Sequence, residues 1–300
     1  MKRLTPRTTP ATNIAFLAIM AGIDALLSLV SALLPASALF LLFFIPFTSA
    51  LVAYYCQARY YPIYLFGALG VCIAVSAWDF QNTLFYVLPG LFTGDVYGFC
   101  LKKNWPSSWS VFLSSLTQFA FFALSLWLVK LFYEVDVRVT LLSMLGKEWS
   151  EEVGIIFPLF ALSYSFGAVS LAHLFFSLQA KYLNLHFPEP PQVDWPSFLA
   201  SILSIALSFL FFFLLPAWGY FFLGLGFYWA LVLFVRRCWN PRWPLFAFLA
   251  GFLFLSVLLF ALFYQKMPAG TGLGLTNLFS LSFAASSFLD SVLGKKKKLA

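Results

Sequence analysis

The feature that most constrains the fold is a series of apolar segments, each about as long as a bilayer is thick. The first, residues 14–34, has the sequence IAFLAIMAGIDALLSLVSALL and is followed by nine others. About 20 apolar residues in a helix cross the hydrocarbon core of a membrane, so these segments predict helical spans. The ten predicted spans are residues 14–34, 37–56, 61–77, 82–101, 109–132, 153–180, 197–215, 217–235, 244–264 and 271–292.

The composition excludes a soluble globular domain. The chain of 300 residues is 62% hydrophobic and only 10% charged, whereas soluble domains carry about 25% charged residues. The net charge of +7 does not indicate nucleic acid as a partner, because the positive residues gather at the ends of predicted spans, where membrane topology explains them. We therefore predict an all-α, polytopic transmembrane helical bundle of about ten spans.

The positive residues also indicate how the spans are oriented. If the N-terminus lies in the cytoplasm, fourteen of the eighteen Lys and Arg residues fall on the cytoplasmic side. Cytoplasmic loops of membrane proteins carry such an excess, so we predict that both termini are cytoplasmic. The start MKRLTPR resembles a signal peptide, but the apolar run after it is longer than the usual ~7–15 residues. We interpret the run as a retained span, and cleavage after Ala38 is the alternative.

Two longer connections divide the predicted spans. Residues 133–152 are polar and hold five acidic residues, and residues 183–196 contain four prolines, which is typical of a stiff, extended connector. The prediction is a six-helix front over residues 1–182, a cytoplasmic connector over residues 183–196, and a four-helix back over residues 197–300.

Motifs that would indicate an enzyme or a metal site are missing from the sequence. It has no GxxxxGK[ST], so ATP cannot bind through a P-loop, and it has no HExxH, no GxSxG and no Cys/His cluster suited to zinc. We expect no enzyme activity, no catalytic residue, no metal and no cofactor. The four cysteines, Cys56, Cys72, Cys100 and Cys238, lack paired spacing, so we expect free thiols.

Three ionisable residues lie within predicted spans: Asp24, Asp95 and His173. Such groups are costly in a membrane unless they face protein, water or a partner. Asp24 fits either a substrate or ion contact or a lock between helices. For Asp95, hydrogen bonding to backbone near Gly94 and Gly98 is favoured over a substrate contact. For His173, a hydrogen-bonded packing role is favoured over a proton relay.

A polar and aromatic cluster lies at the predicted outer end of the third and fourth spans. It offers hydrogen-bond donors, acceptors and an aromatic ring, which suits a small polar or aromatic ligand, and the alternative is an ordinary solvated loop. Two residues of the fifth and sixth spans could line the same cavity. The candidate ligand-binding residues are Trp78, Asp79, Gln81, Asn82, Trp127 and Tyr164.

Small residues line the first span, unlike the Phe- and Leu-rich spans that follow. Ala18, Gly22 and Ala25 share one face, and Ala21 pairs with Ala25 at four-residue spacing. In lipid, close approach of helix backbones across small residues is a main source of helix association. We therefore predict that other helices pack on this one.

This layout resembles two related families of bacterial membrane proteins. Six spans that open with the AxxxA of Ala21 and Ala25, and the break at LPGLFTGDVYGFCLKK, resemble the substrate-binding S components of energy-coupling-factor transporters over about residues 10–182. The full length is more similar to the YybS-like family. The matching segments are FPEPPQVDWP, FFLGLGFYWALVLFVRR, and the end GLTNLFSLSFAASSFLDSVLGKKKK with Asp290 before Lys295 to Lys298.

The resemblance implies a multi-pass subunit of the bacterial cytoplasmic membrane that binds a small metabolite or vitamin from outside. Through Ala18, Ala21, Gly22 and Ala25 it would dock on a transmembrane coupling protein driven by separate ATPase subunits. The alternative is a non-transporting membrane scaffold, in which the last four helices form the interaction module. In either case the terminal lysines are most simply an anchor attracted to anionic lipid.

Overall fold

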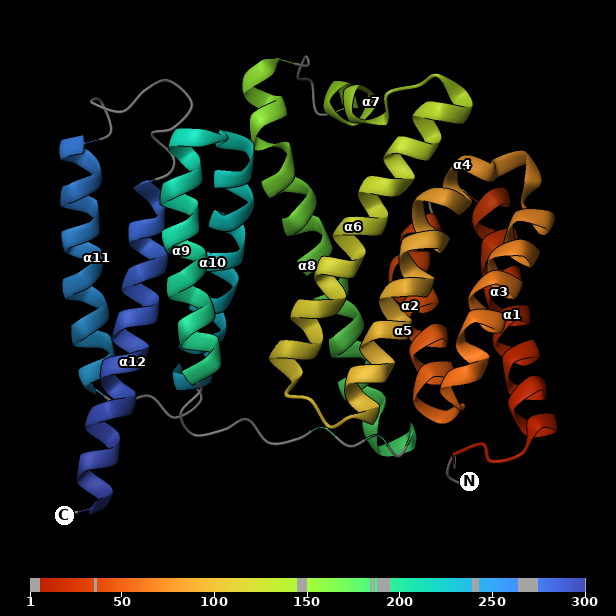
Figure 1. Cartoon of the computed structure of the whole chain (residues 1–300), viewed down its shortest axis with the longest axis horizontal. Coiled ribbons are helices and arrows are strands. Elements are labelled where there is room, and N and C mark those ends of the chain that lie inside the picture. Colours follow the sequence, from red (N-terminus) through yellow and green to blue (C-terminus); the bar gives the residue numbers. More distant parts are fainter. Residues whose placement is uncertain are drawn as a thin grey trace. The chain divides into compact units, whose positions relative to one another are not determined.

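The computed structural model describes residues 6–34, 37–144, 150–183, 185, 187, 195–238, 243–263 and 275–299, and these form helices and connections without any β-strand. Eight helices in this part of the chain are long and apolar enough to cross a membrane, and a shorter apolar helix covers Phe40–Tyr55. The chain is thus an all-α integral membrane protein (Figure 1). Each of the ten predicted spans coincides with or overlaps a helix, while the number that cross a membrane stays a prediction.

Internal contacts divide the chain into two compact units. The front unit comprises Met1–Glu148 and Ser163–Glu189, and the back unit comprises Trp149–Leu162 and Pro190–Ala300. The long helix α8 (Glu151–Leu183) contributes residues to both. The predicted connector, residues 183–196, lies largely outside the described residues.

The front unit is built from apolar helices that alternate in direction. Its other elements are α1 (Pro10–Leu33), α2 (Ala38–Tyr55), η2 (Ala58–Tyr60), α3 (Tyr61–Val75), η3 (Ala77–Asp79), α4 (Phe80–Asn82), η4 (Thr83–Val87), α5 (Leu88–Lys102), α6 (Ser107–Tyr133) and α7 (Val137–Met144). Figure 1 shows α7 as a short helix lying across the end of α6. The segment 133–152, predicted from its polarity to be a loop, therefore contains a helix.

Several positive residues of the front unit lie where its helices begin or end on the same side as the N-terminus. We call this side the basic end, and it carries Arg7, Arg59, Lys102, Lys103 and Lys181. The Lys102 ammonium donates hydrogen bonds to the Cys56 carbonyl (2.5 Å) and to the Tyr61 hydroxyl (3.1 Å). A cation at a helix C-terminus is favourable, so Lys102 stabilises the end of α2.

Three glycines four residues apart bring α5 against α2. A side-chain carbon added at Gly90 would lie 2.9 Å from Ile45 Cγ2, and one at Gly94 or Gly98 would meet a backbone carbonyl oxygen, of Pro46 or Ala50 respectively. Close backbone contact across small residues gives helix association in lipid its strength. The helix of the fourth predicted span is thus largely buried within the protein.

The start of this span is a π-helix over Thr83–Val87. A π turn pairs each carbonyl with the N–H five residues on, and the residue five positions after Leu84 is Pro89, which has no N–H. The Ser125 hydroxyl of α6 donates to the Leu84 carbonyl at 2.7 Å. A side chain from a neighbouring helix therefore completes a hydrogen bond that this proline prevents.

Buried serines line packed helix faces of the back unit. Besides the start of α8 it contains α9 (Trp195–Leu214), α10 (Pro216–Cys238), α11 (Trp243–Phe263) and α12 (Asn277–Leu299). Figure 1 shows these helices running side by side. The buried polar residues of α9 are Ser197, Ser201, Ser204 and Ser208, which share one helix face. Small hydroxyl side chains allow close packing and hydrogen bonds between helices in membranes.

Hydroxyl groups link the helices of the back unit. The Ser208 hydroxyl donates to the Gly219 carbonyl at 2.9 Å and accepts from the Asn277 amide at 2.7 Å, which joins α9, α10 and α12. The Ser256 and Ser282 hydroxyls lie 2.7 Å apart and join α11 to α12. The Ser-rich last helix is accordingly part of a packed interface.

Candidate functional site

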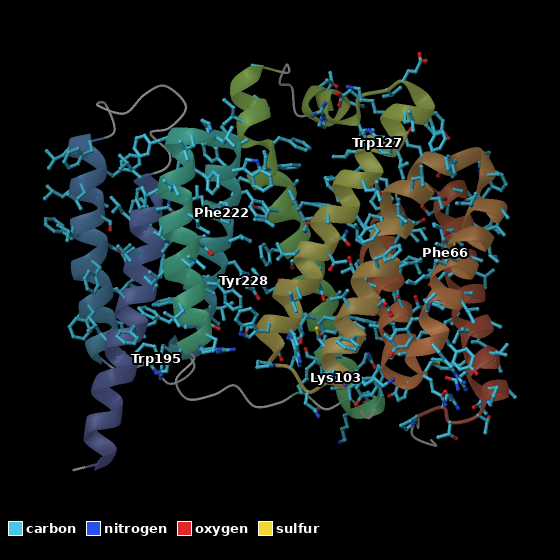
Figure 2. All side chains as sticks on the ribbon, in the orientation of Figure 1. Phe66, Lys103, Trp127, Trp195, Phe222 and Tyr228 are labelled. Carbon is cyan, nitrogen blue, oxygen red and sulfur yellow. The ribbon has the colours of Figure 1, made fainter. Side chains whose placement is uncertain are left out.

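The front unit encloses polar side chains that are costly inside a membrane, and these form the candidate functional site. Figure 2 shows the many side chains that fill the spaces between its helices, with Trp127 and Lys103 near opposite ends. Ionisable residues within membrane spans are uncommon and mark functional sites by default. The buried polar residues of α1, α2 and α3 are therefore candidates for a functional site.

Asp24 of α1 is completely buried and is held by two hydroxyl groups. Thr48 Oγ1 of α2 donates to Asp24 Oδ1 at 2.5 Å, and Tyr64 Oη of α3 donates to Asp24 Oδ2 at 2.5 Å. The two hydroxyls lie 3.4 Å from each other. Three helices therefore meet at one carboxyl group, and its partners come from positions 24 and 40 residues further along the chain.

Two serines extend this polar face of α1. Ser28 and Ser31 follow Asp24 at helical spacing, are 2% exposed, and have hydroxyl oxygens without a hydrogen-bond partner. Ser28 lies beside the Cys72 thiol of α3, which is only a weak hydrogen-bonding group. Sequence analysis singled out Asp24 but missed these serines, although their spacing of four and seven residues after Asp24 was a usable signal.

A second polar contact joins α5 to α8. The Tyr97 hydroxyl lies 2.5 Å from His173 Nδ1, and the Tyr97 ring stacks on Phe176 with ring centres 4.8 Å apart. His173 is thus hydrogen-bonded within the front unit. Nearby along α5, the Thr93 hydroxyl donates to the Gln118 side-chain oxygen of α6 at 2.6 Å.

Asp95 of α5 is partly buried and lies near Tyr61. Gly94 and Gly98 on the same helix closely contact the α2 backbone, and hydrogen bonding of Asp95 to the backbone near these glycines stays a prediction. Asp95 and Asp24 are thus separate carboxyl groups with different surroundings.

The six candidate ligand-binding residues differ in how exposed they are, and a shared ligand site among them stays a prediction. Trp78 on η3 is 65% exposed and Trp127 on α6 is 59% exposed. Tyr164 of α8 is instead partly buried, and its ring centre lies 5.1 Å from that of Phe122. Asp79 is half-buried and Gln81 is exposed, while the side chain of Asn82 lies outside the described set.

Apolar residues fill the region between η4, α5 and α6, near the candidate ligand-binding residues. Leu84, Leu88, Val129 and Val137 form a buried cluster, and Phe92 stacks on Phe121 with ring centres 3.9 Å apart. This packing joins α6 and α7 to the π-helix. Apolar side chains therefore hold these elements of the front unit together.

The small residues of α1 contribute little to packing within the front unit. Ala18 and Gly22 are exposed and Ala21 is half-buried, and only Ala25 is buried. A side-chain carbon added at Gly22 would meet no atom within 4 Å. Helices α2 and α3 pack on α1, but not across Gly22, and it is the glycines of α5 that closely contact another helix backbone.

The described residues contain no group of three or more His, Cys, Asp or Glu side chains that could hold a metal ion. Cys56, Cys72 and Cys100 are buried free thiols, as expected from their spacing, while the Cys238 side chain lies outside the described residues. No protein-family model, no curated protein and no solved structure matches the chain.

Proposed function

We propose that the chain is a substrate-binding subunit, similar to an S component, for uptake of a small metabolite across the bacterial cytoplasmic membrane. It would dock through α1 on a transmembrane coupling protein energised by separate ATPase subunits. Both termini would lie in the cytoplasm. The ligand would enter at the end that carries η3, where Trp78 and Gln81 are accessible.

The observation that carries this proposal is a set of glycines with open space beside them, on two helices of the front unit that pack together. Gly22 of α1 and Gly67 and Gly70 of α3 all have open space where a side chain would lie, and α1 packs on α3. We call these three residues and the exposed Ala18 the small-residue patch.

Glycine inside a helix destabilises it by about 0.5–1 kcal/mol relative to alanine. At Gly90, Gly94 and Gly98 the close approach of α2 offsets that cost. The small-residue patch has no such compensation within the front unit. Since small residues in a membrane helix allow another helix to come close, the patch is suited to a helix of a partner protein.

Affinity purification of variants tests the docking. Gly22→Leu and Gly67→Leu should lower the amount of co-purifying coupling protein and ATPase subunits by about tenfold, because contacts between membrane helices are worth about 1–2 kcal/mol. The melting temperature of each variant in detergent should stay unchanged. Gly251→Leu is a matched control, since Gly251 in the back unit also has open space around it.

Two results would count against docking. If Gly22→Leu and Gly67→Leu unfold the protein while partner binding per folded molecule is kept, the patch serves internal packing, and the scaffold reading replaces the transporter. If the wild-type protein brings down no ATP-binding subunit, the proposed energy source is wrong.

The same preparation tests the expected lack of catalysis. Because the sequence has no phosphate-binding loop, the purified chain without partners should not hydrolyse ATP. Phosphate release that follows the chain through successive purification steps would contradict this expectation.

A further inference from the structure

The side chains that hydrogen-bond to Asp24 do not balance the negative charge of its ionised carboxyl group. Thr48 and Tyr64 supply hydrogen bonds, but both are neutral. The two salt bridges in the described structure, of Asp136 with Lys130 and Arg138, lie elsewhere. A buried carboxylate without a positive partner is disfavoured by several kcal/mol, so an ionised Asp24 calls for a cation.

Among the described residues, the polar side chains near Asp24 contribute oxygen or sulfur and no positive charge. Thr48 projects from α2, while Tyr64 and the more distant Cys72 project from α3. On α1 itself, Ser28 lies one turn beyond Asp24, where residues four apart have Cβ atoms about 5–6 Å from each other. The surroundings of Asp24 are thus rich in oxygen.

The oxygen atoms around Asp24 can accept more hydrogen bonds than the available hydroxyl hydrogens can supply. Thr48 Oγ1 has one hydrogen, yet it lies within 3.5 Å of Asp24 Oδ1, the Ile45 carbonyl, the Phe44 carbonyl and Tyr64 Oη. The buried Ser28 oxygen, which among the described residues has only the weakly hydrogen-bonding Cys72 thiol beside it, adds another acceptor. Hard cations are bound by carboxylate, hydroxyl and carbonyl oxygens of this kind.

We infer that Asp24, Ser28, Thr48 and Tyr64 form a buried site for a small monovalent cation, either a proton or Na⁺. A proton on Asp24 would donate to Thr48 Oγ1 and free the Thr48 hydrogen for the Ile45 carbonyl. A sodium ion would instead take the carboxylate and hydroxyl oxygens as ligands. Either cation neutralises the carboxyl group without a separate cavity for a larger ligand.

This inference goes beyond the proposed function and does not depend on docking. The cation binds where α1 is joined to α2 and α3 by side-chain hydrogen bonds, so its presence should stabilise the front unit. A partner that binds the small-residue patch would contact the same helix, α1, on residues other than those of the cation site.

Thermal unfolding of the full chain in detergent tests the site. A ligand that binds only the folded state raises the melting temperature. At a cation concentration about a hundredfold above Kd, the rise should be roughly 5 °C or more. If the cation is Na⁺, the melting temperature should rise with NaCl but not with choline chloride at equal ionic strength. If it is a proton, the melting temperature should rise as the pH is lowered from alkaline values.

Variants distinguish the two cations. Asp24→Asn should abolish whichever response the wild-type protein shows, while Asp95→Asn, which removes a different carboxyl group of the front unit, should keep it. Ser28→Ala should raise the Na⁺ concentration for half the response by about tenfold, as loss of one ligand of roughly 1.4 kcal/mol would do. A proton response should be unchanged by Ser28→Ala.

Infrared spectroscopy provides a measurement that does not require Asp24→Asn to fold. A bound proton gives the C=O stretch of a carboxylic acid, which should titrate with pH and shift in Tyr64→Phe, because that variant loses a hydrogen bond to Asp24. If wild-type protein shows neither this band nor any response to Na⁺, the inference is wrong and Asp24 only joins helices. A response of either kind that Asp24→Asn retains also overturns it.

Discussion

The front and back units solve the same packing problem with different side chains. In the front unit, Gly94 and Gly98 of α5 bring its backbone against that of α2. In the back unit, the buried serine face of α9 hydrogen-bonds to α10 and α12, as Ser208 does to Gly219 and Asn277. Both arrangements give the close approach that lipid-embedded helices need.

The difference lies in which polar groups remain once the helices are packed. A serine hydroxyl can donate its hydrogen bond to a backbone carbonyl of its own helix, as Ser282 does to Leu278 at 2.8 Å. Helix faces lined by serine are therefore suited to packing alone. A carboxylate has no hydrogen to donate in this way, and the Asp24 carboxyl group instead accepts hydrogen bonds from Thr48 and Tyr64 on other helices. This contrast is why we place function in the front unit.

The largest effect is expected when the glycine contact between α5 and α2 in the front unit is broken. Gly94→Ala would place a methyl group against the Pro46 carbonyl and should lower the free energy of unfolding by about 3 kcal/mol or more. Gly70→Ala, at an open position of α3, should change it by less than about 1 kcal/mol or be stabilising. Thermal unfolding in detergent measures both, and equal losses would remove the distinction between used and unused glycines.

A smaller loss is expected in the serine interface of the back unit. Ser208→Ala removes hydrogen bonds to Gly219 and from Asn277 and should destabilise the protein by about 1–2 kcal/mol. Ser201→Ala is the matched control on the same face, since the buried Ser201 hydroxyl forms no hydrogen bond. Should both substitutions have the same effect, the serines would act through size and not through hydrogen bonding.

An effect confined to one segment is expected from Ser125→Ala. The Leu84 carbonyl would lose its side-chain donor, which costs about 1 kcal/mol. Amide hydrogen exchange should become faster over Thr83–Val87 with little change in melting temperature. Ser114→Ala on the same helix should leave exchange unaltered, because the Ser114 hydroxyl has no hydrogen-bond partner. Unchanged exchange in Ser125→Ala would mean that Pro89 alone maintains the π-helix.

The smallest effect is expected at the exposed ion pairs beside α7. Hydrogen bonds from Arg138 and Lys130 lower the pKa of Asp136 below its usual value. The resulting stability is therefore present above the ordinary Asp pKa of about 3.9 and is lost as the pH falls through the lowered value.

Asp136→Asn should accordingly lower stability by less than about 1 kcal/mol at neutral pH, as is usual for exposed pairs. The difference between variant and wild-type protein should disappear in strong acid. A difference that persists there would show that Asp136 acts through packing and not through its charge. Unfolding of both proteins at several pH values makes the comparison.

The sequence by itself determined the class of fold and the position of the helices. Hydropathy is a local sum over about 20 residues, so residues 14–34 or 197–215 predict a span without reference to any partner. Spacing alone also indicated that Cys56, Cys72 and Cys100 are free thiols. Polarity misled at 137–144, because a short helix at a membrane surface needs no long apolar run.

Only the tertiary structure decided which small and polar residues are used. Gly22 and Gly94 look alike in sequence, yet one is open and the other contacts a backbone carbonyl. The partners of Asp24 and His173 are Thr48, Tyr64 and Tyr97, and nothing local identifies them. Helix rotation and pairing depend on contacts between residues far apart in the chain, which a sum over neighbouring residues does not contain.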